Sequence, residues 1–169
     1  MANQQMTLQE ELLERIRQIL QCDGITRVEK TGGIVSAWIE KLEEGQDWKV
    51  PVMINFVPNG QTGAEESVLQ IYFTLSRNVD VAHPETLMRK LNELNERAII
   101  GSMFVLPIGE ICYEYRLPVK GSSVDRSLAD FELAMKQMLV FLFRFYLYVL
   151  VLSGDSGRMT LEEYLELEE

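Results

Sequence analysis

VPVMINF at residues 50–56 and LQIYFTL at residues 69–75 decide the fold, because each places an apolar side chain at every second position. This period is typical of strands with one buried face. Such stretches are separated by turn-forming segments rich in glycine and polar residues, at 31–33, 43–47 and 59–63. We therefore expect a meander of three strands between 25 and 77, with a further short strand at 25–29 as an open alternative.

Helix signals stand on both sides of these strands. Thr7 and Glu10 form a capping box, which satisfies backbone N–H groups at a helix start, and Gly24 is placed to end that helix. Pro84 opens a second helix, since proline is tolerated at the first helical position, and this helix is expected to end near Ala98. One helix therefore precedes the meander and another follows it.

Beyond the second helix, two short strands at 102–106 and 111–117 are joined by a turn that contains proline and glycine. Ser122 or Ser123 then caps a long helix that runs to about Leu152. The expected fold class is α+β. It has an antiparallel sheet of about five strands in the order α-β-β-β-α-β-β-α, with helices packed on the sheet and a long C-terminal helix.

The second half of this long helix is apolar on every side except at Arg144. Such a helix must be covered on both faces, and one sheet covers only one of them. Three covers are open: a second subunit, the C-terminal tail through Leu161, Tyr164 and Leu165, or a membrane. A membrane span needs about 20 apolar residues, whereas 138–152 supplies 15 with a charge near the centre, so we favour a homodimer. The dimer interface is predicted at Val140, Phe141, Arg144, Leu147, Tyr148 and Val151.

Length and charge limit the class of protein. A chain of 169 residues is typical of one domain. We place it at 1–153, followed by an acidic tail at 154–169 in which Thr160 and Glu163 form a second capping box. Sixteen Lys and Arg against 26 Asp and Glu give a net charge of −10, which argues against nucleic-acid binding. Two cysteines and a polar start without the apolar segment of a signal peptide favour a cytoplasmic location.

The sequence predicts no catalytic residue, no cofactor site and no metal site. His83, the single histidine, precedes a proline at a helix start and is expected to cap that helix at the surface. Cys112 lies in an apolar strand and is expected to be a buried, inert thiol, and Cys22 an equally inert one near a helix end. Adjacent glutamates point apart, and the glycine clusters lack the spacing that cradles phosphates.

The order of elements, the acidic charge and the apolar last helix resemble the YbjN-like family, whose proteins have the type III secretion chaperone-like fold. The resemblance covers residues 7–152 and extends to uncharacterised cyanobacterial proteins of that fold. It implies an α+β homodimer that binds segments of partner proteins without catalysing a reaction. It carries over no functional residue.

We favour a non-catalytic protein-binding homodimer whose sheet edges or apolar grooves take up a protein or peptide segment. Its candidate contact residues are Trp38, Trp48, Tyr113 and Tyr115. The first alternative is a small-ligand-binding protein or an enzyme with a pocket between the sheet and the last helix. Its candidate lining residues are Tyr113, Glu114, Tyr115 and Arg116, although strand alternation puts the tyrosines opposite the charged pair. The second alternative is peripheral attachment to a membrane through the last helix.

Overall fold

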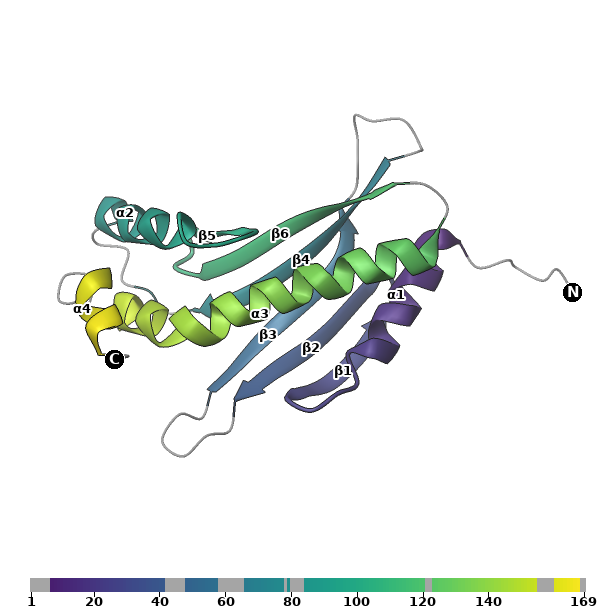
Figure 1. Cartoon of the computed structure of the whole chain (residues 1–169), viewed down its shortest axis with the longest axis horizontal. Coiled ribbons are helices and arrows are strands. Elements are labelled where there is room, and N and C mark those ends of the chain that lie inside the picture. Colours follow the sequence, from purple (N-terminus) through teal and green to yellow (C-terminus); the bar gives the residue numbers. More distant parts are fainter. Residues whose placement is uncertain are drawn as a thin grey trace, which may run out of the picture. The chain divides into compact units, whose positions relative to one another are not determined.

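The computed structural model describes residues 7–41, 48–57, 66–77, 79, 84–120, 123–154 and 160–167. The helices in these ranges are α1 (Leu8–Ile19), α2 (Pro84–Asn95), α3 (Val124–Gly154) and α4 (Leu161–Glu166). The strands are β1 (Ile25–Thr31), β2 (Ile34–Lys41), β3 (Trp48–Val57), β4 (Glu66–Ser76), β5 (Ser102–Val105) and β6 (Ile111–Lys120). Figure 1 shows the strands and helices labelled in this order. The predicted α+β class is confirmed.

The described strands form one antiparallel sheet in the order β1-β2-β3-β4-β6-β5. It has six strands where about five were expected, because residues 25–31 form a full strand that pairs with β2. The two strands are joined through Gly32, and Thr31 lies opposite Ile34. Gly32 has a φ of +60°, which glycine adopts without a Cβ clash. The meander before α2 therefore has four strands.

The chain divides into two compact units. Unit 1 holds the described residues up to Tyr72 together with Arg116–Ala134. Unit 2 holds Phe73–Tyr115 and the described residues from Met135 onward. The predicted separation of a domain at 1–153 from a tail at 154–169 stays a prediction.

In unit 1, α1 packs on the meander. The capping box of Thr7 and Glu10 is present, and Leu12, Leu13 and Ile16 form the buried stripe of the helix. Contacts from α1 reach β1, β2 and β3, and Figure 1 shows α1 beside β1 and β2. The helix ends at Ile19, before the predicted stop at Gly24, because the backbone turns directly after it. Of the apolar positions of β3 predicted from its alternation, Val50, Val52 and Ile54 are buried and Phe56 is half-buried.

Unit 2 is built around Tyr113 of β6, which is fully buried. Its hydroxyl donates to the carbonyl oxygen of Ile100 at 2.8 Å. Gly101 makes this approach possible, because it has a φ of +74° and a Cβ there would lie 2.8 Å from the carbonyl oxygen of Glu114. The Tyr113 ring also lies 6.1 Å from that of Phe73, centroid to centroid. These contacts hold the start of β6 against β4 and against the segment before β5.

The long helix α3 begins where serine capping predicted. The hydroxyl of Ser123 accepts from the backbone N–H of Arg126 at 3.3 Å and so caps the helix, whereas the other predicted cap, Ser122, lies outside the described residues. The helix ends at Gly154, close to the predicted end at Leu152. Its N-terminal part belongs to unit 1 and its part from Met135 onward to unit 2.

Candidate protein-binding surface

The inward side of α3 in unit 2 is a row of aromatic rings. Phe141 lies 5.3 Å from the Tyr113 ring and 4.9 Å from the Phe145 ring, centroid to centroid. Tilted ring pairs at such distances add to the stabilisation that burial itself provides. Leu142 and Val149 are also fully buried. This side of the helix is therefore occupied by the core of unit 2.

The outward side carries an exposed apolar row, which we name the α3 stripe: Val140, Phe143, Leu147 and Leu150. Val140 is 66% exposed, Phe143 44% and Leu150 39%, and Leu147 is half-buried. Their spacing of three, four and three residues places all four on one face of a helix. Contiguous exposed apolar side chains of this kind mark interaction sites on proteins.

The α3 stripe lies in the least acidic segment of an acidic chain. No Asp or Glu occurs between Leu133 and Gly154, whereas Lys136 and Arg144 do. The side chain of Arg144 is exposed, and its guanidinium carbon lies 5.2 Å from the centre of the Phe145 ring. Cation–π contact of this kind holds the guanidinium against the helix surface. The stripe is therefore apolar with a basic flank.

The flank beyond Arg144 is covered by α4. The Tyr164 ring packs at a tilt against that of Tyr148 with centroids 5.2 Å apart, and its hydroxyl donates to the carbonyl oxygen of Arg144 at 2.8 Å. Leu161 and Tyr164 are both buried. The predicted capping box of Thr160 and Glu163 is present and fixes the start of this short helix. Part of the C-terminal tail thus folds back on α3.

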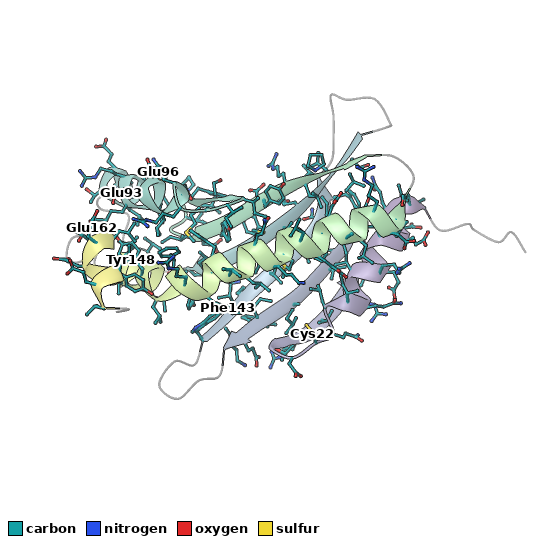
Figure 2. All side chains as sticks on the ribbon, viewed as in Figure 1. Cys22, Glu93, Glu96, Phe143, Tyr148 and Glu162 are labelled. Atoms are coloured by element: carbon teal, nitrogen blue, oxygen red, sulfur yellow. The ribbon has the colours of Figure 1, made fainter. Side chains whose placement is uncertain are left out.

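Tyr148 is the most unusual side chain in this region. It is fully buried, yet its hydroxyl oxygen has no hydrogen-bond partner in the described structure. Burial raises the pKa of Tyr148 to about 12, and the negative charges of Glu93, Glu162 and Glu163 act in the same direction. Figure 2 shows Tyr148 of α3 in the same part of unit 2 as the labelled Glu93 of α2 and Glu162 of α4.

The six residues predicted for a dimer interface do not share one surface. Val140 and Arg144 are exposed, and Leu147 and Val151 are half-buried. Phe141 and Tyr148 pack inside unit 2, so a second subunit cannot reach them without displacing the chain's own side chains. In their place, Phe143 and Leu150 lie on the outward face. The sequence signal for them was the spacing from Val140, which repeats at positions 143, 147 and 150.

The other aromatic candidates are mostly structural. Trp48 and Tyr113 are buried, and Trp38 and Tyr115 are half-buried. Of the charged residues proposed to line a pocket, Glu114 is half-buried and Arg116 exposed. Since both the ring and the hydroxyl of Tyr113 are used in packing, that residue is not available to a ligand.

Both outer strands of the sheet are protected against strand addition. β1 contains a bulge between Thr26 and Glu29, with Arg27 at a φ of 51°. On β5, the side chain of Asn95 accepts from the N–H of Met103 at 2.6 Å and donates to its carbonyl oxygen at 2.9 Å. Bulges, charges and occupied backbone groups are the usual protections of an edge strand. Of the predicted binding modes, the helix surface is therefore favoured over the sheet edges.

Reactive groups are sparse in the part of the chain that the structure describes. No group of three or more His, Cys, Asp or Glu residues there could hold a metal ion. Cys112 is buried as expected, and Cys22 is exposed. The predicted cap His83 lies outside the described residues.

By length and composition, α3 could cross a membrane. It is the one such helix among the described residues, and half of its most apolar window is buried within the protein. Buried core helices of soluble proteins have the same properties. Length and composition therefore do not decide between a core helix and a membrane span.

Residues 60–139 match the YbjN family, described as "Putative bacterial sensory transduction regulator". The matched range holds β4, α2, β5, β6 and the first half of α3. No curated protein matches the chain.

Proposed function

We propose that this chain, of which residues 60–139 match the YbjN family, is a non-catalytic regulator that acts by binding proteins, as a homodimer formed through the α3 stripe. The family description supports the regulatory role. The exposed stripe supports the protein–protein contact. A cytoplasmic site of action is part of this proposal and is supported by the low cysteine content.

The observation that carries the dimer proposal is the symmetry of the stripe. Its intervals of three, four and three residues read the same in both directions. Two copies of α3 that pack antiparallel across a two-fold axis would therefore place Val140 opposite Leu150 and Phe143 opposite Leu147. Isologous contacts of this kind, in which one patch meets itself, are the commonest interfaces of homo-oligomers.

The charge distribution agrees with this arrangement. A chain with a net charge of −10 repels its own copies, and the segment 133–154 is the long helical stretch without an acidic side chain. Arg144 lies on the flank of the stripe, so its guanidinium stays at the rim of the paired helices, where water reaches it. The segment of α3 that carries the stripe therefore contributes no acidic side chain to such an interface.

Light scattering on a size-exclusion column tests the proposal. Val140→Glu puts a charge on the most exposed position of the stripe, where the fold of one chain tolerates it. Ile108→Glu is the matched control, because Ile108 is 74% exposed and lies outside the stripe. We expect a dimer for the natural chain and for Ile108→Glu, and a monomer for Val140→Glu.

Three results would contradict the proposal. If the natural chain is monomeric at micromolar concentration, the stripe is not a dimer interface. A dimer that survives Val140→Glu is built on another surface. A chain that leaves the membrane fraction only with detergent would instead support the membrane alternative, to which the length and composition of α3 point.

A further inference from the structure

The surface that α4 covers has the form of a docking site for a helix. We name it the α4-binding surface: the Tyr148 ring, the carbonyl oxygen of Arg144 and the adjoining side of α2. Tyr164 and Leu161 are buried on it, and Tyr164 bonds the Arg144 carbonyl oxygen at 2.8 Å. Helices of six residues are unstable alone, so α4 keeps its conformation by binding here.

At one end of this surface, α4 places acidic side chains beside acidic ones. It carries Glu162, Glu163 and Glu166, all exposed. The neighbouring end of α2 carries Glu93, and Glu96 follows directly after the helix; both are exposed, and α2 and α4 are in contact. Figure 2 shows Glu93, Glu96 and Glu162 at this same end of unit 2. Like charges across a helix contact weaken it.

α4 also leaves a polar group of the surface unsatisfied. The hydroxyl of Tyr148 is fully buried beneath it and has no hydrogen-bond partner in the described structure. Three of the surrounding carboxylates, Glu93, Glu162 and Glu163, are near enough for their charge to act on this hydroxyl. Leaving a buried polar group unpaired costs free energy, and native proteins rarely do so without a reason.

Building on the proposed function as a protein-binding module, we propose that the α4-binding surface is a docking site for an amphipathic, basic helix of a partner protein, and that α4 is its displaceable occupant. Apolar partner residues three positions apart would take the places of Leu161 and Tyr164. Lys or Arg side chains would pair with Glu93 and Glu96 where α4 presents more acid. An N–H donor from such a side chain would also satisfy the Tyr148 hydroxyl oxygen.

The probe is a fluorescent peptide with the sequence of residues 158–169, in its natural form and with Glu162→Lys and Glu166→Lys. Glu163 is kept in both forms because it completes the capping box. Binding is measured by fluorescence anisotropy to the full chain and to its Tyr164→Ala variant, in which α4 loses its main contact. We expect the Lys peptide to bind Tyr164→Ala at least 10-fold more tightly than the natural peptide does. Its affinity should fall with added salt.

Two further comparisons locate the binding. The full natural chain should bind the Lys peptide more weakly than Tyr164→Ala, because its own α4 competes for the surface. Glu93→Lys in the Tyr164→Ala background should weaken binding of the Lys peptide, whereas Glu132→Lys should not. Glu132 is the matched control, an exposed acid on α3 in unit 1 whose replacement changes the net charge equally.

The inference is overturned if the two peptides bind equally, if neither binds Tyr164→Ala, or if Glu93→Lys has no effect. A second measurement tests the charge argument without peptides, in case the peptides do not form a helix. Glu162→Lys in the full chain should raise the melting temperature relative to Glu132→Lys, and an unchanged value also overturns the charge argument. These results are independent of the dimer, because Val140→Glu leaves the α4-binding surface intact and should leave peptide binding unchanged.

Discussion

Replacing Gly101 with alanine should destabilise the protein for two reasons, backbone strain and steric overlap. Alanine substitutions at other glycines of the chain separate these two effects. Gly101 has a φ of +74°, and its added Cβ would lie 2.8 Å from the Glu114 carbonyl oxygen and 2.9 Å from Cε2 of Tyr113. The left-handed backbone conformation costs an alanine about 1 kcal/mol. The overlap displaces a strand carbonyl and a buried ring by several tenths of an ångström, which costs about 2 kcal/mol.

We therefore expect Gly101→Ala to lose about 3 kcal/mol of unfolding free energy, which lowers the melting temperature of a chain of this size by about 6–12 °C. Gly32→Ala is the control for the backbone term alone, because Gly32 has a φ of +60° and no atom within 4 Å of its Cβ position. Gly33→Ala is the control that carries neither penalty, since no atom lies within 4 Å of its Cβ position and its φ is not in the left-handed region.

Chemical denaturation followed by circular dichroism gives the three free energies. The expected order of destabilisation is Gly101→Ala, then Gly32→Ala at about 1 kcal/mol, then Gly33→Ala within about 0.5 kcal/mol of the natural chain. Equal values for Gly101→Ala and Gly32→Ala would refute the reasoning. They would show that a Cβ atom at residue 101 does not overlap with Glu114 and Tyr113 of β6.

Further predictions concern the edge of β5 and the two buried tyrosines. Asn95→Ala should cost about 2 kcal/mol, because two hydrogen bonds to the Met103 backbone are lost; faster hydrogen exchange of the Met103 amide checks it, and an unchanged rate contradicts it. Tyr148→Phe should be neutral or stabilise the fold by up to about 1 kcal/mol at pH 7, since its hydroxyl is unpaired, whereas Tyr113→Phe should destabilise by about 1 kcal/mol through loss of its bond to Ile100. The opposite order in thermal unfolding would refute this assignment. The pKa of Tyr148 is raised from 10.0 to about 12 in the folded chain, so the unfolded chain ionises first and stability is lost as pH rises from 10 to 12. In Tyr148→Phe this alkaline loss should be smaller, and an identical pH profile would exclude Tyr148 as a contributor.

Features that depend on neighbouring residues could be read from the sequence. The capping boxes at Thr7 and Thr160 involve side chains three residues apart, so the pattern contains the whole interaction. Strand alternation likewise fixed which side chains of β3 face inward. The strand at 25–31 was harder, because its mostly polar sequence follows no clear alternation and it lies at the edge of the sheet.

The candidate site was harder to predict because it depends on contacts between distant segments. The second half of α3 is apolar all round, so no polar face indicates which side lies inward. Tyr148 was therefore predicted to face outward and Phe143 was not, although the former is buried and the latter exposed. Asn95, at the end of α2, protects β5 by bonding the backbone of Met103. The spacing of residues near either position does not indicate this contact.

The most direct test of the antiparallel homodimer is the mass of the double variant Val140→Glu/Leu150→Lys, measured by light scattering beside Val140→Glu alone. In the proposed arrangement each new glutamate faces a new lysine of the other copy, so the double variant should regain a particle of twice 19.5 kDa while Val140→Glu remains a monomer. If the double variant stays monomeric, or if both variants are dimers, the α3 stripe does not pair two copies in this way.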